Sequence, residues 1–260
     1  MTNEQKSMRA TFLSLRMGVG VLGILFPLIL WGGGKIAGFP LRESMSAYYH
    51  ASFACPVPAA PSKSESCPPG GGTMRNAFVG ILFAVGAAMY FYKGFSIWEN
   101  FALNLAGISA ICVAIFPMPW TAEKPQWLSM HFFSAMMFFV CIAFVCTFCS
   151  EKTLQFASFP GGAATRRNFY RSLYGALALI MLASPIAAMI FNRWTNQRSK
   201  TFWIETFGIV AFGVFWLVKT VELSSSGLET DSLQGKVDID RRSLLGHTRK
   251  AHHLTAMARG

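Results

Sequence analysis

The sequence predicts an all-α, polytopic membrane protein: a bundle of six transmembrane helices with a Cys/Pro/Gly-rich external loop. Hydrophobic residues make up 53% of its 260 residues and charged residues only 13%, about half the usual charged share of a globular domain. Between Arg75 and Lys93 lie 17 residues without a charge, enough for a helix that crosses the hydrocarbon core. Four further uncharged stretches resemble this one, and a sixth contains a single acid, Glu205.

The chain begins with a polar and basic segment, residues 1–11, followed by an apolar run. This order is also that of a signal peptide. However, the sequence GGGKIAG that follows the apolar run is a poor cleavage site. We therefore expect an uncleaved first span over residues 12–31.

Residues 32–74 form the longest internal connection, and we expect them to be an external loop. Repeated Pro and Gly in CPVPAAPSKSESCPPGGG block both helix and sheet. Cys55 and Cys67 are the two cysteines outside the predicted spans. In an oxidising compartment they would form a disulfide. The first half of the loop, around Tyr48, is compatible with a short interfacial helix.

The remaining apolar stretches are separated by short polar or proline-containing segments. The prolines of the sequence PMPW are expected to end the third span, and Pro185 predicts a kink in the fifth. Residues 223–260 are Ser-rich, then acidic, then basic, and predict a disordered tail at the membrane surface. Spans two to six are predicted at residues 76–92, 98–116, 127–149, 173–191 and 202–221.

The distribution of Lys and Arg predicts the orientation. If the N-terminus is cytoplasmic, the inside segments carry 15 of these residues and the outside segments carry 8. We therefore expect both termini in the cytoplasm. The net charge of +11 then favours contact with anionic lipid headgroups. No zinc-finger spacing, RNP-like sequence or helix-turn-helix pattern occurs, so membrane lipids and not nucleic acid are the predicted partners.

Two ionisable residues are predicted inside the outer boundary of the membrane. His131 lies near the outer start of the fourth span and Glu205 near the outer start of the sixth, each about one helical turn from the boundary. Ionisable groups at membrane depth are costly and usually face a partner or a cavity. We therefore expect His131 and Glu205 to meet inside the bundle.

The segment SMSAYYH in the external loop adds polar groups on the same side. Ser46, Tyr49 and His50 share one face if the segment is helical. The sequence thus predicts an outward-facing polar pocket that binds a lipid or a small amphiphile at headgroup level. The predicted ligand-binding residues are Ser44, Ser46, Tyr49, His50, Arg75, Asn76, His131 and Glu205.

Other functions stay open at this point. His50, His131 and Glu205 would supply two imidazoles and a carboxylate for a metal such as zinc, and a zinc-bound water would attack a lipid ester or amide. Alternatively, His50 or His131 is a base towards Ser46, with Glu205 as orienter. A third alternative is purely structural: these polar groups would only form hydrogen bonds with one another and hold the loop on the bundle. A small-solute transporter, or a subunit of a membrane complex with a homo-oligomeric or membrane-protein partner, is a further alternative.

The opposite membrane side carries a smaller polar set. Asn100 and Asn104 are four residues apart and share a helix face, as expected for hydrogen bonds between helices. Lys219 and Glu222, at the end of the sixth span, would join this set as structural contacts.

Four segments carry a family resemblance: SMSAYYH, RNAFVGILFAVGAAMYFYKG, WENFALNLAGISAICVAIFP and WIETFGIVAFGVFWLVK. Together they resemble a family of uncharacterised bacterial multi-pass membrane proteins. The resemblance implies a six-helix domain in the bacterial inner membrane, without an established activity. A fainter likeness links the chain to the alkaline-ceramidase and progestin-receptor superfamily of zinc-dependent membrane hydrolases, in which Ser46, His50 and His131 would have catalytic roles. The chain differs from that superfamily, because it has six predicted spans rather than seven and lacks His-x-x-x-His in the last.

Overall fold

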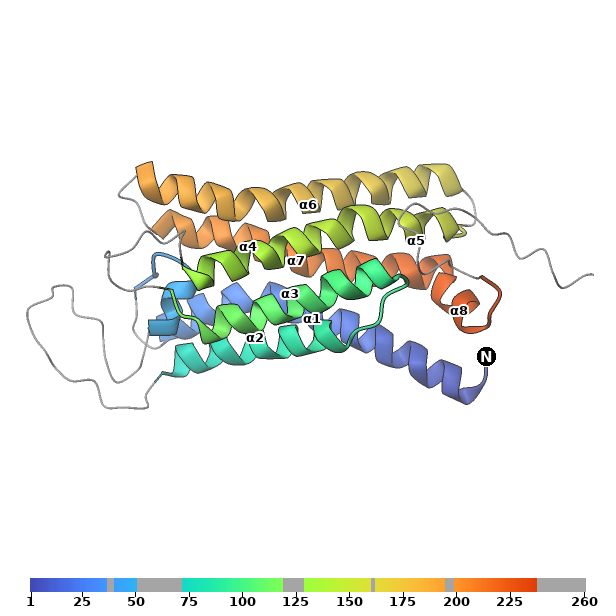
Figure 1. Ribbon diagram of the computed structural model, residues 1–260, viewed down its shortest axis with the longest axis horizontal. Helices are drawn as coiled ribbons and strands as arrows, with labels where there is room; N and C mark the ends of the chain where they lie inside the picture. The colour runs from blue at the N-terminus through green and yellow to red at the C-terminus, as the bar shows by residue number, and fades with distance from the viewer. Residues whose placement is uncertain (37–39, 51–71, 119–128, 160–161, 195–198, 238–260) are drawn as a thin grey trace, which may run out of the picture.

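Six helices of the computed structural model are long and apolar enough to cross a membrane, and they run side by side (Figure 1). The structure describes residues 1–36, 40–50, 72–118, 129–159, 162–194 and 199–237. In these parts of the chain it contains helices and no strand, as the sequence predicts. The long helices are α1 (Asn3–Ile36), α2 (Thr73–Phe91), α3 (Ile97–Ile115), α4 (Met130–Phe144), α6 (Ala163–Trp194) and α7 (Ser199–Ser226).

Shorter elements complete the bundle. The π-helix η3 (Val145–Cys149) follows α4 directly, and α5 (Ser150–Phe156) continues from it, so that the fourth candidate span extends over Met130–Phe156. The 3₁₀ helix η1 (Ser46–His50) and the helix α8 (Leu228–Leu233) lie at opposite ends of the bundle (Figure 1). We call these ends the η1 end and the α8 end.

The long helices form a closed ring. Helix α1 packs on α2, α2 on α3 and α3 on α4; α4 then packs on α6, α6 on α7, and α7 again on α1. Most connections in the ring join neighbours in sequence, as is usual in helical bundles. Because the ring closes, every long helix has one face towards a common interior.

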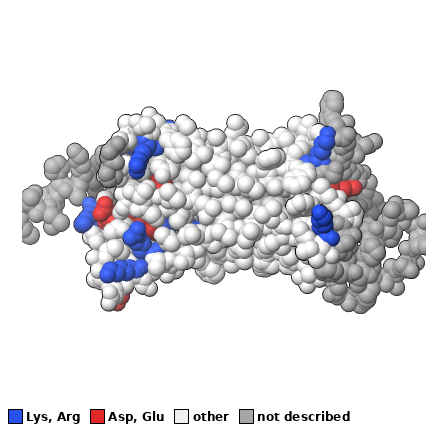
Figure 2. Space-filling view, turned by 180° about the vertical axis from the view of Figure 1, so that it is seen from behind, with Lys and Arg blue, Asp and Glu red and all other residues white. Residues whose placement is uncertain are grey.

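Charged side chains gather at the two ends of the molecule. On the face seen in Figure 2, an uncharged band separates a charged η1 end from a charged α8 end. Large apolar side chains such as Phe207 and Leu179 are exposed on the surface of the long helices. An exposed apolar surface of this extent suits contact with lipid. The arrangement is that expected of a multi-pass membrane protein.

Two of the helices, α3 and α4, have a serine as their N-cap. Ser96 accepts a hydrogen bond from Glu99 N–H at the start of α3, and Ser129 accepts one from Phe132 N–H at the start of α4. Such N-caps satisfy amide groups that have no partner within the helix. The cap at Ser129 fixes the first turn of α4, which carries His131.

Glycine permits a close contact between helices α2 and α3. A Cβ atom added to Gly86 of α2 would lie 2.7 Å from the backbone oxygen of Gly107 on α3. Because backbone cannot yield as a flexible side chain can, the two helices can approach this closely only without side chains there.

Helices α1 and α6 are longer than the predicted spans 12–31 and 173–191, and α5 and the start of α6 occupy much of the polar segment between the predicted fourth and fifth spans. Hydropathy detects only the apolar part of a helix, whereas the backbone hydrogen bonds continue into polar turns. The start of the predicted disordered tail also differs, because α7 continues to Ser226 and α8 packs on the bundle. Burial of Leu228 and an ion pair of Glu229 hold α8 there.

The predicted disulfide between Cys55 and Cys67 falls outside the described residues. Cys112, Cys141, Cys146 and Cys149 are free thiols. Three of these, Cys141, Cys146 and Cys149, are buried, as is usual for free cysteines, which pack as small apolar side chains.

Candidate functional site

A cavity of about 470 Å³ opens at the η1 end and extends into the interior of the ring. This volume falls within the roughly 300–1,000 Å³ that small-molecule sites occupy. All six long helices contribute to its wall, so the cavity follows directly from the closure of the ring. One wall residue from each helix in chain order is Gly23, Val85, Ala110, Phe138, Ser184 and Phe212.

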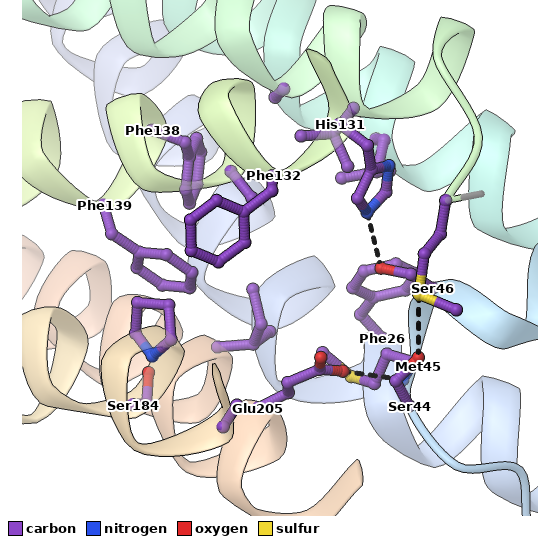
Figure 3. A pocket seen from close by; sticks show the side chains of 18 of the residues that line it. Phe26, Ser44, Met45, Ser46, His131, Phe132, Phe138, Phe139, Ser184 and Glu205 are labelled. Atoms are coloured by element: carbon purple, nitrogen blue, oxygen red, sulfur yellow. Dashed lines mark hydrogen bonds between the residues drawn. The ribbon is translucent and has the colours of Figure 1, made fainter. Parts of the chain in front are cut away.

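The cavity is deep, and its inner wall is mostly apolar. Val85 and Phe212, which line it, lie 12 and 13 residues from the η1-end termini of α2 and α7. At a rise of ~1.5 Å per residue, this places them about 18–20 Å inside the bundle. Phe138 and Phe139 add aromatic surface from α4 (Figure 3). The inner part can therefore hold an extended hydrocarbon chain parallel to the helices.

The mouth of the cavity is formed by the turn that precedes η1. Ser44 starts this turn, because its hydroxyl accepts a hydrogen bond of 3.1 Å from Ala47 N–H. Tyr48 then anchors η1: only 1% of the residue is exposed, and its ring packs on that of Phe202, with 5.8 Å between centroids. Burial raises the pKa of Tyr48, so its phenol is neutral. A Cβ atom on Gly34 would lie 2.7 Å from the Tyr48 ring, so a glycine here makes room for the anchor.

Ser46 and His131 form a hydrogen-bonded pair at this mouth (Figure 3). Ser46 Oγ lies 2.7 Å from His131 Nε2, and His131 Nδ1 lies 2.8 Å from the carbonyl oxygen of Phe116. Because a carbonyl oxygen can only accept, Nδ1 carries the ring proton. In the neutral imidazole, Nε2 is then the acceptor, and the Ser46 hydroxyl donates to it. Ser46 is thus held as a hydroxyl beside a basic nitrogen.

Glu205 and Thr201 contribute from the first turns of α7. Glu205 Oε2 accepts a hydrogen bond of 2.7 Å from Met45 N–H, and no described residue forms an ion pair with it. Thr201, one helical turn earlier, is 7% exposed and lines the same cavity. Its hydroxyl has no hydrogen-bond partner among the described residues. A ligand in the cavity would supply one, since buried polar groups are rarely left unpaired.

The two ionisable acids that line the cavity are Glu43 and Glu205, and none of the described residues that line it is Lys or Arg. An anionic group would therefore find no cation among these lining residues to offset the loss of its hydration. A neutral or cationic head group fits this mouth.

Four of the predicted ligand-binding residues line the cavity: Ser44, Ser46, His131 and Glu205. The other four do not. His50 Nε2 lies 3.1 Å from the carbonyl oxygen of Met118. The Arg75 guanidinium lies 5.9 Å from the ring centroid of Tyr49, and Asn76 is exposed on α2.

The predicted metal ligands have separate partners. His50 is beside Met118, His131 bonds to Ser46 and Phe116, and Glu205 bonds to Met45. In the described parts of the chain, no three His, Cys, Asp or Glu side chains are grouped so that they could hold a metal ion. The arrangement at the mouth instead brings the Ser46 hydroxyl beside a ring nitrogen of His131.

A second polar cluster lies near the α8 end. Arg16 of α1 makes two hydrogen bonds of 3.0 and 2.9 Å to the carboxylate of Glu229 on α8, and a third of 3.2 Å to Tyr92 OH. Arg16 is only 1% exposed. The pair therefore fixes α8 to α1, and breaking it would leave a charge buried without a partner.

Lys219 and Glu222 of α7 form the other half of this cluster. Lys219 Nζ lies 2.8 Å from Glu222 Oε2 and also donates to Thr153, while Tyr174 OH donates to Glu222 over 2.5 Å. These contacts join α7 to α5 and α6 beside the π-helix. Because these polar groups bond to one another, a structural role is sufficient to explain them, as the sequence suggests for Lys219 and Glu222.

Sequence reasoning did not find Thr201, Met118, Arg16 or Glu229. Thr201 was within reach, because it lies four residues before Glu205 and therefore on the same helix face. Arg16 and Glu229 are 213 residues apart, and no local pattern connects them.

Comparisons with protein-family models, with curated proteins and with solved structures give no match to this chain. Functional conclusions therefore depend on the geometry of the cavity.

Proposed function

We propose that the protein binds a single-chain amphiphile with a neutral, hydrogen-bonding head group, such as a monoacylglycerol, in the cavity at the η1 end. The observation that carries this proposal is the combination of a deep apolar interior with a polar mouth in one cavity. The hydrocarbon chain would lie between Val85 and Phe212, and the head group would lie beside Ser46, His131 and Glu205.

The mouth favours a neutral head over an anionic one. The carboxyl group of Glu205 accepts a hydrogen bond, the Thr201 hydroxyl has no partner among the described residues, and no described cation lines the cavity. A polyol head can donate to Glu205 and accept from Thr201. A fatty-acid anion or a phosphate would pay for desolvation without a compensating ion pair.

The ligand can enter from the surrounding lipid. Met189 and Ile190 of α6 line the cavity and are 41% and 52% exposed. The ligand would enter beside these two residues. Pro185, which also lines the cavity, lies inside α6 and weakens its backbone hydrogen bonding there.

The membrane context is part of the proposal. The Lys and Arg counts and the family resemblance support a bacterial inner membrane with both termini in the cytoplasm. The η1 end, with its cavity, then faces outward. A homo-oligomer or a membrane-protein partner stays a prediction.

Binding can be measured on the full chain in lipid nanodiscs with dodecylglycerol, a neutral ether-linked amphiphile that cannot be hydrolysed, and with laurate as the anionic comparison. We expect saturable binding of dodecylglycerol and weaker binding of laurate. Ala135→Phe places a ring in the cavity, and Val140→Phe places the same ring on the exposed face of α4.

Loss of dodecylglycerol binding in Ala135→Phe, together with its retention in Val140→Phe, supports the cavity as the site. Equal binding by both variants, or preference for laurate, contradicts the proposal.

A further inference from the structure

We propose that Ser46 is the nucleophile of an acyl-transfer reaction, with His131 as its general base, and that the substrate is the ester of a single-chain amphiphile. This inference rests on the proposed function, because the cavity must first bind the hydrocarbon chain. It assigns the site a reaction class that binding alone does not require.

The geometry of the pair carries the inference. A serine nucleophile is activated by an adjacent base within about 2.6–3.2 Å, and the base is in turn oriented by a third group. Ser46 Oγ lies 2.7 Å from His131 Nε2, and the Phe116 carbonyl fixes the opposite nitrogen of the ring. The tautomer is therefore the one that can take the proton of the Ser46 hydroxyl.

The position of Ser46 matches the position of an ester. In a monoacylglycerol, the ester carbonyl lies between the hydrocarbon chain and the polyol. Ser46 likewise lies between the apolar interior of the cavity and the end of the bundle (Figures 1 and 3). A chain inserted towards Phe212 would thus leave its carbonyl carbon at the level of the mouth. Hydrocarbon binding would supply the orientation that such reactions need.

Neighbouring elements hold the nucleophile in place. Met45 N–H, directly before Ser46 in sequence, is bonded to Glu205 on α7, and Ala47 N–H, directly after it, is bonded to Ser44. Ser46 therefore lies on a turn fixed on both sides. Glu205 acts here through the backbone and is a positioning residue.

The reaction balances with water as its second substrate. In the first step, Ser46 Oγ bonds to the ester carbonyl carbon and its proton passes to His131 Nε2. The bond between that carbon and the alcohol oxygen then breaks, and the alcohol leaves with the proton from His131. In the second step, water gives a proton to His131 and bonds to the acyl carbon. Ser46 Oγ leaves that carbon and regains the proton, which releases a fatty acid.

The reaction can be followed with p-nitrophenyl laurate, from the release of p-nitrophenolate by the full chain in nanodiscs. Dodecylglycerol binding is measured on the same samples. We expect Ser46→Ala to abolish turnover and His131→Gln to lower it about 100-fold or more, in line with loss of a general base. His50→Gln is the control, because His50 belongs to the same segment as Ser46 but does not line the cavity. We expect this variant to keep the wild-type rate.

A fluorophosphonate with a long alkyl chain provides a second readout, because it labels an activated serine covalently. We expect mass spectrometry to find the label on Ser46, and a much slower labelling in His131→Gln. Wild-type protein that binds dodecylglycerol but neither turns over the ester nor labels at Ser46 overturns the acyl-transfer inference and leaves the binding function intact. If Ser46 is labelled as fast in His131→Gln as in the wild type, His131 is not the general base. Absence of dodecylglycerol binding overturns both proposals.

Discussion

The carboxylate of Glu205 on α7 accepts a hydrogen bond of 2.7 Å from Met45 N–H, across 160 residues of sequence. This bond holds the turn that carries Ser46 against the mouth of the cavity, and Glu205 lines the cavity without an ion pair to any described residue. One side chain therefore both positions the segment and offers an acidic group to a ligand.

Neutralising this acid should change which head group binds. In Glu205→Gln the side-chain oxygen can still accept from Met45, but the side chain can no longer ionise. We expect the ratio of laurate to dodecylglycerol affinity to rise about tenfold, equivalent to ~1.4 kcal/mol. Binding titrations of both ligands to wild type and variant measure this ratio. A ratio that stays constant would show that Glu205 does not select against anions.

The Arg16–Glu229 pair should be important for stability. Arg16→Met leaves Glu229 buried without its cation, and we expect a loss of about 3–5 kcal/mol. Lys6→Met, on the exposed part of the same helix, should have little effect. The double variant Arg16→Met/Glu229→Leu should recover much of the loss, because it removes both charges. Thermal unfolding of the four proteins gives the comparison. Equal stability of Arg16→Met and Lys6→Met would contradict it.

The contact between α2 and α3 predicts a difference between two glycines of one helix. Gly86→Ala drives a methyl group into the Gly107 carbonyl, at an initial distance of 2.7 Å, and should cost about 1–3 kcal/mol. Gly80→Ala has nothing within 4 Å of the new atom, and should be neutral or slightly stabilising. Unfolding temperatures of the two variants provide the readout. A Gly86→Ala protein as stable as wild type would mean that the helices are not this close.

Tyr92 predicts an alkaline dependence of stability. Burial, together with the nearby carboxylates of Glu99 and Glu229, raises its pKa to about 12, although the charge of Arg16 acts in the opposite direction. Since the folded protein prefers the neutral phenol, this contribution is complete below the ordinary tyrosine pKa of about 10 and is lost as pH rises from there to about 12. The stability advantage of wild type over Tyr92→Phe should therefore shrink above about pH 10. A constant or growing advantage would contradict the direction of the shift.

The sequence predicted the fold well because span length and hydropathy are properties of single helices. It also predicted that His131 and Glu205 lie on the same side of the bundle, and both line the cavity. They do not bond to each other as expected, because Glu205 bonds to Met45 and His131 bonds to Ser46 and Phe116. The sequence did not predict which face a residue occupies. Asn76 was included in the site, but it lies two residues from the buried Met74 and therefore on the opposite face of α2.

Contacts across the bundle were beyond sequence reasoning. The sequence left open whether His50 or His131 is the base for Ser46, because the choice depends on how η1 packs. Tyr48, buried against Phe202, sets that packing. The partner of Arg16 likewise depends on the fold of α8, which composition alone assigns to a disordered tail.

The proposed ligand places its hydrocarbon chain inside the ring of helices. A dodecylglycerol with a diazirine at the end of its chain tests this directly, because irradiation links that end to the residues beside it. Mass spectrometry should locate the links at the floor of the cavity, on Val85 or Phe212. Links found only on lipid-facing residues such as Leu179 and Phe207 would show that the amphiphile stays outside the ring, and would contradict the account.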